Sequence, residues 1–212
     1  PLLTLPSSLD PFLPTFLSIL MSGTASERES AANGITELVT MSHMSVLKPY
    51  LIKTAGPLIR VVGDRFPSSV KYAIIQALVV LLTKGSSSLK AFVPQLQTTF
   101  VKALLDPSKQ VRTKAAHALG QLMSLSTRVD PLLVELGTSY SSSDSLAVKA
   151  SILQAMVEVV EKGGEKATVT GYTKCIPICM SCLDSDDDVI RSVAAHCLGA
   201  VCVHSPASIV SD

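Results

Sequence analysis

Apolar residues recur along the chain at helical spacing, in blocks that are separated by short polar turns. In the segment LDPSKQVRTKAAHALGQL, for example, the i, i+3, i+4, i+7 pattern places apolar side chains on one face. These residues are Val111, Ala115, Ala118, Leu119 and Leu122. The alternation that is typical of β-strands gives no comparable signal. The pattern therefore predicts amphipathic helices from one end of the chain to the other.

The helical blocks repeat with a period of about 40 residues. The segment 105–122 aligns with DSDDDVIRSVAAHCLGAV at 184–201, and a weaker copy, SSDSLAVKASILQAMVEVV, lies between them. A basic residue holds the same place in these copies and in two upstream ones: Arg28, Lys71, Arg112, Lys149 and Arg191. Such a period without strands predicts helical-hairpin repeats. We place them at about 1–45, 46–87, 88–126, 127–164 and 165–212.

Each repeated helix follows another helix that contains a proline, as in LKPYLIKTAGPLIRVV. Polar turns such as DPSKQ and DSDDD join the two, and their Asp and Ser residues suit N-caps. Helix, polar turn and helix at this period, with a D-x(n)-V-[RK]-x-x-A-A-x-A-L-G core, resembles the HEAT-repeat family. The resemblance implies an all-α fold, an α-solenoid of about five HEAT repeats in a single array. Both ends read as ordinary repeats without polar caps, so we expect a fragment of a longer solenoid.

Composition and charge narrow the possible functions. Of the 212 residues, 47% are hydrophobic and 4% aromatic, which is ample for a core of Leu, Val, Ile and Ala. A net charge of +1 gives no global field that would attract nucleic acid. The mean hydropathy of +0.42 is high, yet apolar stretches such as YAIIQALVVLL are too short to span a bilayer. We therefore expect no membrane partner.

Motifs that carry chemistry give little support to catalysis. The chain contains no G-x-S-x-G, no P-loop and no H-E-x-x-H. We expect no enzyme, no cofactor and no small-molecule substrate.

The cysteines follow residue 174, and their number, five, favours free thiols in a reducing compartment. Cys175, Cys179 and Cys182 have the C-x3-C-x2-C spacing of radical SAM enzymes, but they fall on one face of a predicted helix. The favoured reading is therefore small core residues without a metal. A zinc site completed by His196 is the alternative that is kept open.

Acidic and basic residues recur at similar offsets near the predicted turns. Asp106 precedes Arg112, Asp144 precedes Lys149, and Asp186 or Asp188 precedes Arg191. In a solenoid these positions stack from repeat to repeat, so we interpret them as a structural charge ladder. An exposed pair of this kind is worth about 0.5 kcal/mol.

Arg60, in the segment GPLIRVVGDRFPSSVK, does not lie at this repeated position. It shares a helix side with Asp64, four residues on, and Arg65 and Lys71 follow. A charge that the repeat does not require is a better candidate for partner binding than one that it does, and arginine is a frequent interface anchor. We predict a docking face formed by Arg60, Asp64, Arg65 and Lys71. The competing interpretation is a solvated rim residue.

The segments LKPYLIKTAGPLIRVVGDRFPSSVK, PQLQTTFVKALLDPSKQVRTKAAHALG and RVDPLLVEL resemble one family closely. It is the C-terminal HEAT region of the general-control translational activator, a giant cytoplasmic protein that associates with ribosomes. The resemblance implies binding to the RWD domain of the kinase that phosphorylates initiation factor two alpha, and activation of that kinase under amino-acid starvation. It also implies that this binding is sensitive to an arginine in the region, which we place at Arg60, with Arg65 and Arg112 as alternatives.

Two other functions stay open at this point. One is a ribosome- or RNA-contacting surface, which would use the basic row Lys102, Lys109, Arg112 and Lys114. The other is a structural spacer within a large solenoid, which would bind no partner at all.

Overall fold

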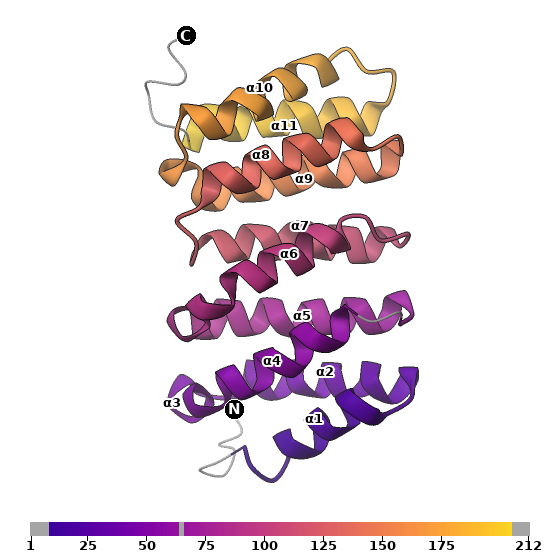
Figure 1. The fold of residues 1–212 in the computed structure, drawn as a ribbon, viewed down its shortest axis with the longest axis vertical. Helices are drawn as coiled ribbons and strands as arrows, with labels where there is room; N and C mark the ends of the chain where they lie inside the picture. Colours follow the sequence, from indigo (N-terminus) through magenta and orange to yellow (C-terminus); the bar gives the residue numbers. More distant parts are fainter. Residues whose placement is uncertain (1–8, 64–65, 205–212) are drawn as a thin grey trace. The chain divides into compact units, whose positions relative to one another are not determined.

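The computed structural model describes residues 9–63 and 66–204, and over these residues the regular structure is helical and contains no strand. The chain forms two compact units, residues 1–99 and 100–212. The two units are described separately, with the element labels of Figure 1. No helix of the described residues is long and apolar enough to cross a membrane.

The first unit consists of two helical hairpins and the segments that follow them. Its helices are α1 (Leu13–Ser22), α2 (Ala25–Met41), α3 (Met44–Leu47), α4 (Leu51–Val62) and α5 (Ser68–Gly85), followed by the 3-10 segment Ser86–Phe92. Helix α1 pairs with α2 and α4 pairs with α5, while α2 packs against α5 and α1 against α4. The hairpins therefore stack in two layers, first helices in one and second helices in the other. Helix α6 (Val93–Ala103) begins in this unit and ends in the second.

The second unit repeats the same two-layer arrangement. Its helices are α7 (Lys109–Met123), α8 (Val129–Ser142), α9 (Leu146–Gly163), α10 (Val169–Cys182) and α11 (Asp188–His204). Helix α9 lies between α7 and α11, and α8 lies beside α10 (Figure 1). Because α9 is covered on two sides, apolar residues occupy most of its circumference, whereas exposed helices keep a single apolar stripe.

In the first hairpin, the turn between α1 and α2 is held by the basic residue of the repeat, Arg28. The Arg28 guanidinium donates to the carbonyls of Gly23 and Met21 at 2.6 and 2.8 Å, and to the carbonyl of Leu20. These carbonyls lie at or just beyond the end of α1, where a helix leaves its last acceptors without partners. Arg28 also lies over the Phe66 ring, 4.5 Å from its centroid, and so reaches the turn of the next hairpin. The repeated arginine thus closes one turn and contacts its neighbour.

At the opposite end of the second helices, lysines form similar hydrogen bonds to backbone carbonyls. Lys84, in the last turn of α5, donates to the carbonyls of Thr40 and Ser42 at the end of α2. Lys166, just after α9, donates to the carbonyls of Met123 and Ser126 at the end of α7, at 2.8 and 3.4 Å. Each contact joins second helices of successive hairpins within one unit. Hydrogen bonds from cations to carbonyls therefore occur near both ends of the second helices.

One glycine allows the closest approach between second helices. A Cβ at Gly120 in α7 would lie 2.9 Å from the backbone oxygen of Glu158 in α9. Gly199 holds the equivalent place in α11, 79 residues later, and a Cβ there would meet nothing within 4 Å. Gly120 is therefore needed for the close packing of α7 on α9.

Candidate protein-docking site

Helix α4 has one buried and one exposed face. The buried face is formed by Leu51, Ala55, Leu58 and Val62, which follow helical spacing. The opposite side carries Ile52, Lys53, Gly56 and Arg60, and we call these four residues the α4 face. Residues 52, 56 and 60 are four apart, so they form a stripe that runs about 12 Å along the helix.

Arg60 lies exposed in the last turn of α4. Within residues 9–63 and 66–204 its guanidinium has no hydrogen-bond or ion-pair partner. A cation in the last turn interacts favourably with the helix dipole, which makes its charge easy to accommodate there. A guanidinium group at such a place can bind a carboxylate of another molecule in a bidentate manner.

Ile52 and Lys53 give the α4 face a mixed chemistry. The Ile52 side chain is 58% exposed, which is high for a large aliphatic residue, and Lys53 next to it is exposed as well. An apolar side chain with one cation next to it and a second two turns along the same helix is complementary to an acidic surface with an apolar patch.

Pro57 changes the backbone at the centre of this face. Proline has no amide hydrogen, so the i to i−4 hydrogen bond to the carbonyl of Lys53 is missing. The oxygen of that carbonyl is therefore an acceptor to which another molecule could donate. Gly56 precedes the proline, and the absence of a Cβ avoids the clash that disfavours a helical residue in this place. A Cβ at Gly56 would meet nothing within 4 Å, so the surface is open and shallow here.

The structure places the predicted docking residues unequally. Arg60 is exposed, whereas Lys71 is half-buried in the first turn of α5 and has an interaction of its own. Asp64 and Arg65 lie outside the described residues. Arg60 and Lys71 flank the same α4–α5 turn, because one ends its helix and the other begins the next.

Arg112, the alternative anchor, lies in a structural position. Only 5% of its surface is exposed, and its guanidinium donates to the carbonyls of Asp106 and Pro107 at 2.9 and 2.8 Å. Its Nε donates to Ser151 Oγ at 3.0 Å, which joins α7 to α9. The Asp106 carboxylate accepts from the amide of Ser108 at 2.9 Å. A buried guanidinium with three such contacts is not available to a partner.

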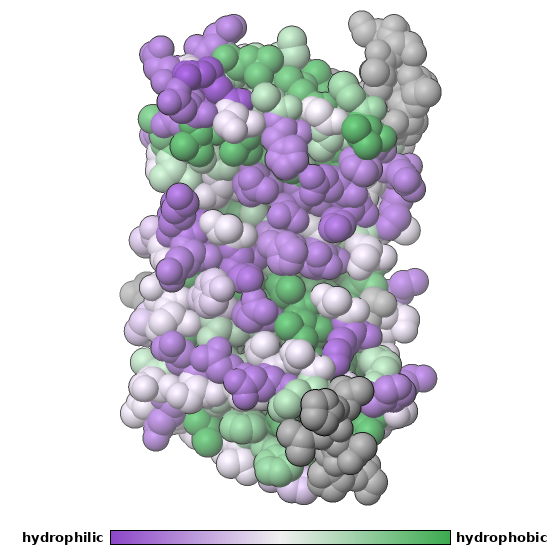
Figure 2. Space-filling model, turned by 180° about the vertical axis from the view of Figure 1, so that it is seen from behind, coloured by the Kyte–Doolittle hydropathy of each residue, from purple (hydrophilic) through white to green (hydrophobic). Residues whose placement is uncertain are grey.

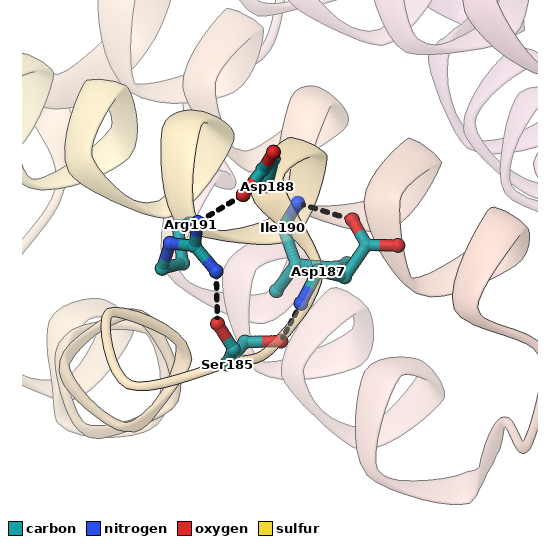
Figure 3. A network of polar contacts seen from close by, with 5 residues as sticks. All are labelled: Ser185, Asp187, Asp188, Ile190 and Arg191. Carbon is teal, nitrogen blue, oxygen red and sulfur yellow. Dashed lines mark hydrogen bonds and ion pairs between the residues drawn. The ribbon is translucent and has the colours of Figure 1, made fainter.

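The turn between α10 and α11 is the last one in the predicted charge ladder. It has the same arginine-to-carbonyl contact, together with an ion pair. Arg191 donates to the carbonyl of Ser185 at 2.6 Å and pairs with the carboxylate of Asp188 (Figure 3). Asp187 caps the helix by accepting from the amide of Ile190 at 3.0 Å, and its own amide donates to Ser185 Oγ (Figure 3). Asp186 is exposed beside this network.

Between these turns, the lysine of the repeat has a different partner. The Lys149 ammonium lies 5.3 Å from the centroid of the Tyr140 ring. Asp144 is exposed, and within the described part of the chain no ion pair joins it to Lys149. The repeated basic residues thus share a place beside the turn, while the group that each contacts varies.

Sequence reasoning did not single out Ile52 or Lys53. Both are ordinary residues of a helical pattern, and the only available signal was that Ile52 lies outside the apolar stripe of α4. Of the basic row considered for RNA, Lys102 and Lys109 are exposed, Arg112 is buried, and Lys114 has an interaction of its own. Figure 2 shows polar side chains over the α7–α9 side of the second unit and apolar ones towards α11. The exposed apolar residues at that end include Val189 and Val203.

Comparison with solved structures defines the class of protein. A designed armadillo repeat protein superposes with a TM-score of 0.66 at 15% identity, covering 94% of this chain and 85% of that one. The N-terminal region of TSC2 superposes with a TM-score of 0.59 at 15% identity, covering 92% and 51%. Residues 68–122 match the HEAT-like repeat family. The chain is an α-solenoid of HEAT repeats, as its period predicted.

Sequence relatives identify the particular family. Residues 130–211 match the family described as "Stalled ribosome sensor GCN1-like, HEAT repeats". The chain is 43% identical over 211 residues to Protein ILITYHIA of Arabidopsis thaliana, covering 100% of this chain and 8% of that protein. It is 42% identical to the eIF-2-alpha kinase activator GCN1 of Dictyostelium discoideum and 37% identical to the stalled ribosome sensor GCN1 of Mus musculus. These matches cover 92% and 90% of this chain, and 7% of each relative. The chain belongs to the GCN1 family and spans less than a tenth of the length of these relatives.

Proposed function

We propose that this chain is a non-catalytic scaffold segment that docks a partner protein on the α4 face. The observation that carries the proposal is the exposed Arg60, which has no polar partner among the residues that the structure describes, on one face with exposed Ile52 and Lys53. A HEAT-repeat fold supports it, because such solenoids present extended surfaces for binding.

The proposed partner is the RWD domain of the kinase that phosphorylates initiation factor two alpha. Relatives of this chain carry the names eIF-2-alpha kinase activator and stalled ribosome sensor. A docking surface for that kinase in a ribosome-associated protein accounts for both names. The role of the chain would be to recruit and position the kinase on ribosomes in the cytoplasm, with no chemistry of its own.

The α4 face also indicates what the partner surface should look like. Lys53 and Arg60 require carboxylates about 10 Å apart, since they lie seven positions apart along the helix. Ile52 requires an apolar contact between or beside these groups. We expect Arg60 to contribute most, because a bidentate guanidinium–carboxylate pair is an effective interface anchor.

Calorimetric titration of the chain with the purified RWD domain tests this proposal. We expect binding by the parent and at least a tenfold weaker affinity for Arg60→Ala, which corresponds to about 1.4 kcal/mol. Arg128→Ala is the matched control, because Arg128 is also exposed and the same charge is removed from another helix end. Circular dichroism should show the same helix content in all three proteins.

The other outcomes are equally informative. Equal affinity for the parent and Arg60→Ala would show that the RWD domain binds elsewhere on the chain. No binding by the parent would contradict the docking function and leave a structural segment of the solenoid.

A further inference from the structure

Four sulfur atoms converge in the core of the second unit. The Sγ atoms of Cys175, Cys179 and Cys197 all lie within 4.8 Å of one another. Met156 Sδ lies 3.7 Å from Cys175 Sγ. The four residues come from α9, α10 and α11, and each is 0% exposed. We call them the sulfur cluster.

The repeat itself does not require sulfur at these places. At the offset of 79 residues the positions of Cys175, Cys179 and Cys197 correspond to Leu96, Phe100 and Ala118. All three of these hydrocarbon side chains are buried, so the same core positions can be filled without a thiol. Three cysteines that meet at core positions which hydrocarbon side chains fill elsewhere in the chain point to a property of sulfur rather than to its volume.

The separations suit a metal ion bound by thiolates. A metal–sulfur bond of about 2.3 Å puts two sulfur ligands about 3.8 Å apart in tetrahedral and about 4.0 Å apart in trigonal geometry. The Sγ atoms of Cys175 and Cys197 are 3.8 Å apart, and all three fall within 4.8 Å. Cys175 and Cys179 reach the same point because residues at i and i+4 share a helix face.

We propose that the sulfur cluster is a binding site for one Cu(I) ion, with Cys175, Cys179 and Cys197 as ligands and the Met156 thioether as a weaker fourth donor. Each coordinating thiol that ionises releases its proton as the sulfur–copper bond forms. The ion would join α9, α10 and α11 and would be shielded from water by the core.

The donor set favours Cu(I) over Zn(II). Thiolate and thioether groups together select soft ions such as Cu(I), whereas zinc takes its fourth ligand from Cys, His, Asp or Glu. His196, the residue that sequence analysis considered for this place, lies with Nε2 3.2 Å from Glu161 Oε1 and its side chain is largely exposed. Cys182, the remaining buried cysteine, lies with its Sγ 2.9 Å from the Tyr140 hydroxyl.

Thiols bind a metal ion as thiolates, so copper binding should release protons and tighten as the pH rises.

The test is an anaerobic titration of the reduced protein with Cu(I), in competition with the colorimetric chelator bathocuproine disulfonate. We expect one copper per chain held against the chelator, and an X-ray absorption spectrum with sulfur ligands only, at about 2.3 Å. Cys197→Ser should weaken binding at least a hundredfold, and Met156→Leu about tenfold or less. Cys202→Ser is the control, because Cys202 is exposed and lies outside the cluster.

A second measurement needs no variant. In mild urea, where buried thiols open transiently, Cu(I) should slow alkylation of the three cluster cysteines at least tenfold and leave Cys202 unchanged. Loss of copper in Cys202→Ser, equal retention in Cys197→Ser, nitrogen or oxygen ligands in the spectrum, or stoichiometric Zn(II) that Cu(I) does not displace would each overturn the proposal.

Discussion

Two arginines in different parts of the chain show opposite environments. Arg112, at the α6–α7 turn, is buried and donates to two carbonyls and a hydroxyl. Arg60, in the last turn of α4, is exposed and has no polar partner among the described residues. The same type of side chain therefore stabilises a turn in one place and is exposed in the other. The difference follows the repeat: Arg112 lies at its basic position, and Arg60 does not.

The largest effect should come from Arg112. Replacement of Arg112 by Met leaves the carbonyls of Asp106 and Pro107 without their donor in a buried turn. We expect a loss of about 2–4 kcal/mol in the free energy of unfolding, measured by urea denaturation. Arg60→Met should change it by less than about 0.5 kcal/mol, as exposed substitutions usually do. Equal losses in the two variants would remove the distinction between them.

A pair of equivalent glycines tests the packing that surrounds Arg112. Gly120→Ala would force a Cβ to within 2.9 Å of the Glu158 backbone, so α7 and α9 must separate. We expect a net loss of about 1–2 kcal/mol, because the strain exceeds the gain in helix propensity. Gly199→Ala, where the Cβ meets nothing, should instead be neutral or gain up to about 1 kcal/mol. Thermal unfolding of both variants separates these outcomes.

Replacement of the apolar residue of the α4 face tests the exposed surface around Arg60, in contrast to the buried turn around Arg112. Ile52→Ser should leave the unfolding free energy within about 0.5 kcal/mol, because Ile52 is 58% exposed. Affinity for the RWD domain should fall about tenfold if Ile52 is buried in the complex. Leu146→Ser, at 56% exposure on α9, is the matched control and should bind like the parent. An unchanged affinity for Ile52→Ser would restrict the contact to the charged residues.

The smallest effect is expected beside Arg28, in the first unit. Glu27 accepts hydrogen bonds from the amide and hydroxyl of Thr24 at 2.7 and 2.8 Å. The backbone bond, and then the hydroxyl bond, lower the pKa of the Glu27 carboxyl. A carboxyl whose pKa is lower in the folded than in the unfolded state stabilises the fold at pH values above its unfolded-state pKa. This stabilisation is lost as the pH falls through the folded-state pKa. An NMR titration should give a Glu27 pKa below 4.5, and Glu27→Gln should remove this pH dependence.

The basic residue at the turns shows what the sequence could predict and what it could not. The spacing of Arg28, Arg112 and Arg191 located it at the start of each second helix. Its contacts could not be predicted, because which group it meets depends on how the turn folds back. Arg112 donates to two carbonyls and a hydroxyl, Arg191 contacts a carbonyl and a carboxylate, and Lys149 lies over the Tyr140 ring. The docking residues Arg60, Asp64, Arg65 and Lys71 stay a prediction.

The sequence by itself determined the helical hairpins, their period and the HEAT-repeat class, because apolar spacing, capping residues and the repeated core are local properties of the chain. Only the tertiary structure showed that Met156, Cys175, Cys179 and Cys197 meet, and that Ile52 joins Arg60 on an exposed face. The physical reason is that one repeat cannot bury its own faces. Which side chains are covered, and which meet across helices, is decided by the neighbouring hairpin.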